Sequence, residues 1–247
     1  MRAMPSAAAP FVALGRDAGA LGLELTAAQL AACERYAGAL IEANRTVNLT
    51  AITEPRDIAV KHFLDSFTAY AARPWTGHER VVDVGSGAGF PGLALRIALP
   101  GITLTCVEAT GKKARFIERV RDELGLAGTR VENARAEELA RLPAHRARYD
   151  VATARALGSL AACVELLVPF LSVGGEAIVW KGRLDAELAS AGRALALLGA
   201  ETRAVIPTTA LGLDGNLPGR SLVVMRKVRA TPERYPRTPA EMKRRPW

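Results

Sequence analysis

The sequence predicts an α/β fold with a mostly parallel sheet flanked by helices and a small helical N-terminal cap. The first observation is a change of rhythm after residue 80, where short apolar runs alternate with helical segments, as in βαβ units. The second is the amphipathic spacing of residues 26–45, which is typical of a helix. The third is a glycine-rich turn, VGSGAGFPG, directly after the first apolar run.

The N-terminal segment, residues 1–79, is predicted to form the helical cap. Thr26 with Gln29 three residues later is a capping box, which marks the start of the first amphipathic helix. A second helix is expected from about Glu54, after a linker that contains residues 48–50.

The central segment, residues 80–230, is predicted to form the domain that carries the parallel sheet. A helix is expected over residues 112–124. The strands are expected, in order, at VVDV, ITLTCVEA, TRVENA, YDVATARA and GEAIVWKG, with a further strand, SLVVMRKV, near an edge.

Net charge and composition favour an anionic partner. The chain carries a formal charge of +8, and a nucleic acid is the usual partner of such a protein. Arg outnumbers Lys by 27 to 6, so a compositional bias is an alternative source of the charge. No membrane span, signal peptide or zinc-binding cysteine pattern is present, so we expect a cytoplasmic protein without a metal.

The C-terminal tail, residues 231–247, is basic and contains four prolines. This composition predicts that the tail forms no packed element. Two roles stay open for it: a clamp on RNA, or an extension that lies on the sheet.

A nucleotide-cofactor loop is predicted at the glycine turn. Gly85, Gly87 and Gly89 stand at every second position after a buried-strand pattern that ends at Val84. The same letters contain a G-x-G-x-x-G that begins at Gly87, so a dinucleotide such as NAD is one candidate. A tight turn in an α/β protein without any cofactor is the other alternative.

Two carboxylates decide between the cofactors. Glu108, at the end of the second strand, can accept hydrogen bonds from the ribose hydroxyls of any nucleotide cofactor. Asp83, beside the turn, would repel the pyrophosphate of a dinucleotide. It suits the cationic amino group and sulfonium of S-adenosylmethionine, directly or through a water. The residues therefore predict S-adenosylmethionine and, with it, a methyltransferase.

Several motifs together resemble one known family. The run DVGSGAGFPGLALRIALP, followed by VEATGKKARFIERV, is similar to the bacterial small-subunit ribosomal RNA guanine-N7 methyltransferases, the GidB or RsmG family. NLTAITEPRDIAVKHFLDS, YDVATARALGSL, WKG and YPRTPAEMKRRP agree, so the resemblance covers roughly residues 25–247. It implies a Rossmann-like class I methyltransferase fold and methylation of guanine N7 in a loop of small-subunit (16S) ribosomal RNA.

The resemblance also implies roles for single residues. It implies that Gly85, Gly87 and Phe90 form the wall of the loop. Glu108 would hold the ribose, with Ala109 and Thr110 along the same edge. Ala136 and Glu137 would lie at the adenine, and Arg155 would line the pocket. Two departures from the family, Ala88 for a frequent proline and Glu108 for a common aspartate, leave the turn and the carboxylate in place.

Guanine N7 offers an unprotonated lone pair, so the chemistry needs positioning and no general base, and no catalytic residue is assigned. Arg155 and Lys181 are substrate-side candidates because they stand at the carboxyl ends of neighbouring strands, where they can meet phosphate or guanine O6. His62 is a third, with a hydrogen-bonded structural role as its alternative. The target is expected to be an unpaired or flipped-out nucleotide.

Two other functions stay open from the sequence. One is a methyltransferase that acts on a small molecule, for which salt would matter little. The other is an RNA-binding assembly factor that keeps the fold without using the cofactor. The expected partner in the main interpretation is small-subunit ribosomal RNA or the assembling subunit, with neither a membrane nor an obligate protein partner.

Overall fold

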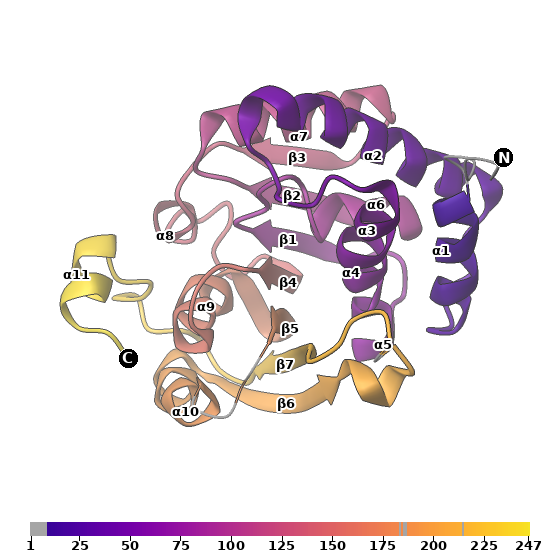
Figure 1. The fold of residues 1–247 in the computed structure, drawn as a ribbon. Helices are drawn as coiled ribbons and strands as arrows, with labels where there is room; N and C mark the ends of the chain where they lie inside the picture. Colours follow the sequence, from indigo (N-terminus) through magenta and orange to yellow (C-terminus); the bar gives the residue numbers. More distant parts are fainter. Residues whose placement is uncertain (1–8, 183, 185–186, 214) are drawn as a thin grey trace, which may run out of the picture.

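A seven-stranded sheet forms the centre of the molecule (Figure 1). The structure is a computed structural model that describes residues 9–182, 184, 187–213 and 215–247. The strand order is β3-β2-β1-β4-β5-β7-β6, and β7 runs in the opposite direction to the other strands of this sheet. The strands are β1 (Arg80–Val84), β2 (Thr103–Val107), β3 (Thr129–Glu132), β4 (Tyr149–Arg155), β5 (Leu171–Lys181), β6 (Ala200–Pro207) and β7 (Ser221–Lys227).

This topology confirms the predicted α/β, Rossmann-like fold. The chain order of the parallel strands reverses between β1 and β4, so the carboxyl ends of these two strands border the position where such sheets bind ligands. The edge strand β6 was not predicted. Its side chains are mostly exposed, so the segment lacks the apolar run that marked the other strands.

Helices cover both faces of the sheet (Figure 1). The face that packs against the N-terminal helices is covered by α1 (Ala9–Gly19), α2 (Ala27–Val47), α3 (Pro55–Ile58), a π-helical turn (Ala59–Leu64), α4 (Asp65–Phe67), α5 (Ala69–Ala72), α6 (Gly92–Ala98) and α7 (Gly111–Glu123). The other face is covered by α8 (Ala136–Leu139), α9 (Leu160–Leu167), a 3-10 turn (Val168–Phe170) and α10 (Glu187–Leu198). A 3-10 turn (Thr208–Leu211) precedes β7, and α11 (Pro239–Arg244) lies in the tail.

The predicted N-terminal helices are present and join the main core. The Thr26 hydroxyl accepts from the Gln29 backbone N–H, and the Gln29 side chain accepts from the Thr26 N–H, as the capping box predicts. Phe63 is fully buried in the same apolar cluster as Val81 of β1 and Ile178 of β5. The helices before β1 therefore pack directly on the sheet.

The prediction that the C-terminal tail forms no packed element is wrong. Tyr235 is buried, and the Arg237 guanidinium pairs with the Glu165 carboxylate of α9 at 2.6 Å. The Trp247 indole N–H donates to the same carboxylate at 2.7 Å. Glu165 is fully buried, so its charge requires partners, and the tail supplies them. Composition does not reveal such a long-range pairing.

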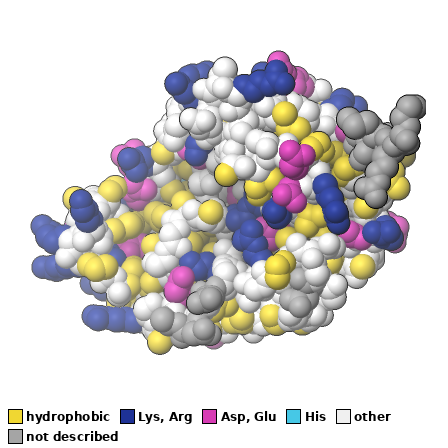
Figure 2. Space-filling model, viewed as in Figure 1, with side chains coloured by type: hydrophobic (Ala, Val, Ile, Leu, Met, Phe, Trp, Pro, Cys, Tyr) yellow, Lys and Arg dark blue, Asp and Glu magenta, His cyan; other side chains and the backbone are white. Residues whose placement is uncertain are grey.

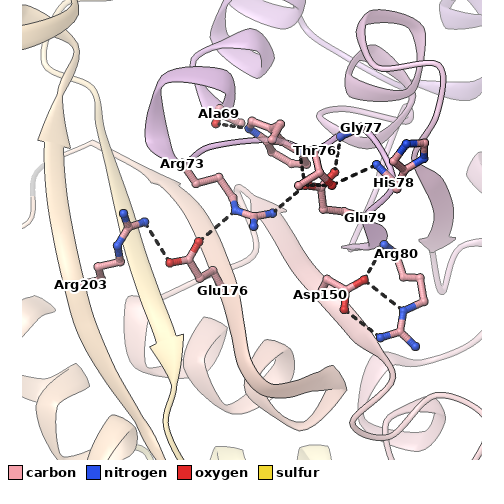
Figure 3. Close-up of polar contacts among 11 residues, drawn as sticks. Ala69, Arg73, Thr76, Gly77, His78, Glu79, Arg80, Asp150, Glu176 and Arg203 are labelled. Carbon is pink, nitrogen blue, oxygen red and sulfur yellow. Dashed lines mark hydrogen bonds and ion pairs between the residues drawn. The ribbon is translucent and has the colours of Figure 1, made fainter.

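Ion pairs join the segments at the amino-terminal edge of the sheet. Figure 3 shows Arg73, which follows α5, directed at Glu176 of β5, with 3.0 Å between Nε and Oε2. Glu176 also accepts from Arg203 of β6 at 2.9 Å. Beside them, Arg80 and Asp150 pair β1 with β4 at 2.8 Å. One carboxylate thus links the N-terminal helices to the edge strand.

The three cysteines, Cys33, Cys106 and Cys163, are buried free thiols. Within the described ranges, no helix combines the length and the apolar character that a membrane span needs.

Candidate cofactor and acceptor site

A cavity of about 560 Å³ opens at the carboxyl ends of β1, β2 and β4. This is the edge where the topology predicts a ligand. Of the residues predicted for the site, the cavity is lined by His62, Gly85, Gly87, Phe90, Glu108, Ala109, Ala136, Glu137 and Arg155. Lining residues that the sequence did not single out include the cations Lys61, Arg135 and Arg220.

The glycine turn follows β1 and has a backbone that other residues rarely adopt. The φ angles are +70° at Gly85, +60° at Gly87 and +91° at Gly89, all in the left-handed region. A Cβ atom at Gly85 would come 2.5 Å from Cδ1 of Leu157, another cavity residue. The absence of a side chain at Gly85 therefore lets Leu157 pack against the turn, whereas the atom nearest to a Cβ at Gly87 lies 3.9 Å away, which leaves room for a ligand close to the backbone.

Helix α2 supports the turn from outside the sheet. The Tyr36 ring stacks on the Phe90 ring with 4.7 Å between centroids, and the Tyr36 hydroxyl donates to the carbonyl oxygen of Ala88. His62 stacks on Phe90 as well, at 4.8 Å. Sequence reasoning missed Tyr36, because its position in an amphipathic helix indicates only a core residue.

Glu108 joins the turn to the end of β2. One carboxylate oxygen accepts the Gly87 N–H at 2.9 Å, and the other accepts the Thr110 N–H at 2.8 Å. Asn133 donates to the Glu108 carbonyl oxygen at 2.8 Å. Each carboxylate oxygen keeps a second lone pair, which can accept a ribose hydroxyl.

Replacing Glu108 by Gln is expected to raise the Kd for S-adenosylmethionine by about tenfold or more, because one of the two backbone N–H groups would then face an amide NH₂. Titration calorimetry measures the change. Glu108→Asp keeps both acceptor oxygens and is the matched control, for which a smaller rise is expected. Equal affinities of wild type and Glu108→Gln would contradict the role.

Asp83 lies behind the turn instead of in the cavity. Its fully buried carboxylate accepts from the Gly92 N–H at 3.1 Å and from the Thr153 hydroxyl at 2.8 Å. A Cβ atom at Gly92 would come 2.9 Å from the Asp83 side chain. Burial raises the pKa of Asp83 to about 6. The sequence predicts that Asp83 meets the cofactor directly or through a water; in the structure its carboxylate binds the Gly92 N–H and fixes the start of α6.

Arg155, the last residue of β4, holds the cavity together at its other end. Its guanidinium donates to the Asp65 carboxylate at 3.0 Å and to the Lys61 carbonyl oxygen at 3.0 Å. Arg220 approaches the same Asp65 oxygen at 3.4 Å. Asp65 is fully buried. Because two guanidiniums face this single carboxylate, one positive charge remains in excess.

His62 is a neutral ring in this arrangement. Arg155 can only donate, so the His62 Nδ1 atom at 3.0 Å accepts. The proton therefore sits on Nε2, which donates to the Thr50 hydroxyl at 2.9 Å. Burial and the charges of Arg155 and Arg220 lower the pKa of His62 to about 3. Both ring nitrogens are thus engaged.

Besides Asp83, two predicted residues lie outside the cavity lining, Lys181 and Thr110. The Lys181 ammonium pairs with Glu187 at 2.7 Å and donates to the Gly158 carbonyl oxygen at 2.6 Å, which holds it away from the cavity. Thr110 contributes its backbone N–H to Glu108 and precedes α7. Arg220 was missed because it precedes β7, whose antiparallel direction brings its beginning to the cavity edge.

The fold and this site define a class I methyltransferase. A solved structure of an S-adenosylmethionine-dependent methyltransferase from Aquifex aeolicus superposes with a TM-score of 0.54, over 69% of this chain and 93% of that one, at 13% identity. The glycine cradle and the Glu108 carboxylate fit S-adenosylmethionine, which is the cofactor.

The chain belongs to the GidB family, rRNA small subunit methyltransferase G, whose match spans residues 29–210. "Ribosomal RNA small subunit methyltransferase G" of Dehalococcoides mccartyi strain CBDB1 is 43% identical over 88% of this chain and 92% of its own length. The protein of the same name from Pelotomaculum thermopropionicum is 40% identical over 92% and 94%. The predicted family and methyltransferase class are confirmed.

Proposed function

We propose that the protein methylates N7 of a guanine in a loop of small-subunit (16S) ribosomal RNA, in the cytoplasm. The names of its relatives support the RNA substrate. The choice of atom rests on the end of the cavity formed by Lys61, His62, Arg155 and Arg220, here called the acceptor end. Among the described residues there, no side chain is free to take a proton. Guanine N7 has a lone pair and no proton to lose, so it suits such a site.

The cofactor would lie between the glycine turn and α8. Gly85, Gly87 and Phe90 would form its wall, and Glu108 would accept from the ribose hydroxyls. Ala109 and Thr110 would follow along the ribose edge, and Ala136 and Glu137 would border the adenine. When bound, the cofactor supplies an electrophilic methyl group. Asp83 would act through the turn that it anchors.

Positioning of the base is the main task of the chain's own residues. Arg155 and Arg220 present N–H groups that can bind guanine O6 or a neighbouring phosphate. Methylation leaves positive charge on the base, which two uncompensated arginines would disfavour. Asp65 offsets one of these charges, and a neutral His62 adds none.

The proposal also divides the chain into an N-terminal segment of residues 1–79 on the substrate side, a cofactor-binding domain of residues 80–230, and a tail of residues 231–247. The N-terminal segment would shape the acceptor end, because Lys61 and His62 come from it.

The test is transfer of a labelled methyl group from S-adenosylmethionine to unmodified small subunits and to their naked RNA. Chemical cleavage at N7-methylguanosine then maps the product. A single cleavage in an unpaired loop is the expected result. No label in either substrate, with cofactor binding intact by calorimetry, would overturn the proposal in favour of a small-molecule substrate.

The assembly-factor alternative requires a separate variant. Gly85→Val places a side chain against Leu157 in a left-handed backbone and is expected to abolish cofactor binding. If cells with this variant assembled and modified their small subunits as the wild type does, methyl transfer would not be the function.

A further inference from the structure

The positive charge of the chain is concentrated in two segments. Residues 227–247 contain seven Lys and Arg and two Glu, a formal charge of +5, and residues 141–148 contain three Arg and no acid, a charge of +3. The whole chain carries +8, so all other residues sum to zero. A compositional bias would spread the excess along the chain, and this distribution does not.

The two segments form one surface, here called the tail surface. Arg146 donates to the carbonyl oxygens of Thr231 and Tyr235 at 3.0 and 2.9 Å, and Arg141 donates to that of Pro236. A second cavity of about 560 Å³ lies where the segments meet. Its charged lining residues are Arg141, Arg146, Arg148, Lys227 and Glu233.

Most cations of the tail surface have no ion-pair partner among the described carboxylates. Arg237 is paired with Glu165, and Lys227 is buried against the carbonyl oxygens of Val168 and Leu171. Arg146 is half-buried and donates to backbone carbonyl oxygens of the tail. The other seven are exposed and form no ion pair with a described carboxylate: Arg141, Arg148, Arg229, Arg234, Lys243, Arg244 and Arg245. Glu233 and Glu241 offset part of their charge, and an external anion would offset more.

The α11 end of the tail surface is bound to α9, a helix that borders the cofactor cavity. Glu165, which binds Arg237 and Trp247, is followed in α9 by Leu166, a lining residue of the cofactor cavity. In Figure 2 Lys and Arg side chains gather at the side where Figure 1 places α11. A polyanion bound at α11 would therefore lie within one helix of the cofactor cavity, whereas Arg148 and Lys227 lie at the amino-terminal edge of the sheet, where β4 begins and antiparallel β7 ends.

We propose that the tail surface binds the phosphodiester backbone of the RNA strand whose nucleotide enters the cofactor cavity. The identity of this strand rests on the proposed function. Six of the seven exposed cations are Arg, whose planar fork matches phosphate oxygens, and a regular row of phosphates fits a row of exposed guanidiniums.

The test is a charge-neutralising variant of α11 and the residue after it, Lys243→Gln, Arg244→Gln and Arg245→Gln together. The matched control replaces Arg35, Arg130 and Arg193 by Gln. These three are exposed and form no side-chain hydrogen bond or ion pair among the described residues, and they lie outside the tail surface. Binding of full-length chains to unmodified small-subunit RNA is followed by fluorescence anisotropy over a range of KCl concentrations.

The α11 variant is expected to raise the RNA Kd at least about tenfold and to reduce the slope of log K against log salt by about 2, since three phosphate contacts are lost. The control variant changes the slope by less than about 1. Cofactor affinity stays at the wild-type value. In turnover the KM for RNA rises while kcat at saturating RNA is retained.

An unchanged Kd and slope in the α11 variant would overturn the proposal, and methyl transfer to RNA by the wild type would then still support the proposed function. If the α11 variant lost RNA binding but the wild type transferred no methyl group to RNA, the proposed RNA-binding surface would be supported and the proposed function would be wrong. If the α11 variant kept RNA affinity and instead lost binding to vesicles of anionic lipid, the surface would belong to a membrane and the RNA proposal would be wrong.

Discussion

Replacing Arg155 by Met is expected to slow methyl transfer at least about 100-fold and to lower the free energy of unfolding by about 3 kcal/mol. Arg155 contacts three groups at once, and its loss leaves the buried Asp65 carboxylate with Arg220 alone, at 3.4 Å. The other Asp65 oxygen has no hydrogen-bond partner, so the buried carboxylate would keep only the longer contact with Arg220. Single-turnover transfer and chemical denaturation measure the two effects.

The pKa of His62 provides a readout that general destabilisation does not move. Arg155 is one of the causes that hold this pKa near 3, so it should rise in Arg155→Met, which NMR titration detects. Arg155→Lys keeps the positive charge but not the planar guanidinium, so we expect it to have a methyl-transfer rate and a stability between those of Arg155→Met and the wild type. Adding Asp65→Asn to Arg155→Met should restore stability without restoring transfer. A variant with wild-type stability and rate would refute this account.

Gly89→Ala is expected to lower the free energy of unfolding by about 2–4 kcal/mol and to weaken cofactor binding strongly. The left-handed φ of +91° costs an alanine about 1–2 kcal/mol, and its Cβ would also meet the Tyr36 hydroxyl and approach Cδ1 of Leu93 to 2.8 Å. Thermal unfolding and calorimetry measure the two losses.

Gly87→Ala separates the cost of the left-handed backbone from the cost of a steric clash with the Cβ atom. Gly87 has a similar positive φ, yet the atom nearest to its Cβ lies 3.9 Å away, so only about 1 kcal/mol should be lost. Combining Gly89→Ala with Tyr36→Phe removes the colliding hydroxyl and should recover part of the stability. Equal losses in the two glycine variants would show that the contact with Tyr36 is unimportant.

Local pattern was sufficient for much of the fold. Strands β1, β2, β4 and β5 were predictable because each contains an apolar run bounded by turn residues, and the capping box marked the start of α2. The glycine turn and Glu108 were found because they lie next to each other in every parallel sheet of this kind. These features depend on residues close together in the chain.

The remaining features depend on residues that meet only after folding. The edge strand β6 hides its pattern because one face is exposed, and Arg220 reaches the cavity only because β7 runs backwards. The inward turn of Asp83 toward Gly92 and Thr153 follows from packing of α6 on β1 and β4. The pairing of Glu165 with the tail is likewise invisible to composition.

The contact between α2 and the glycine turn restricts how this protein can be rebuilt. Enzymes with separate recognition modules can exchange one module for another and keep the catalytic part. Here the aromatic ring of Tyr36 backs Phe90 and its hydroxyl binds Ala88, so the helices before β1 form part of the cofactor site itself. A chimaera that replaced residues 1–79 with a foreign recognition segment would lose its cofactor together with its old substrate.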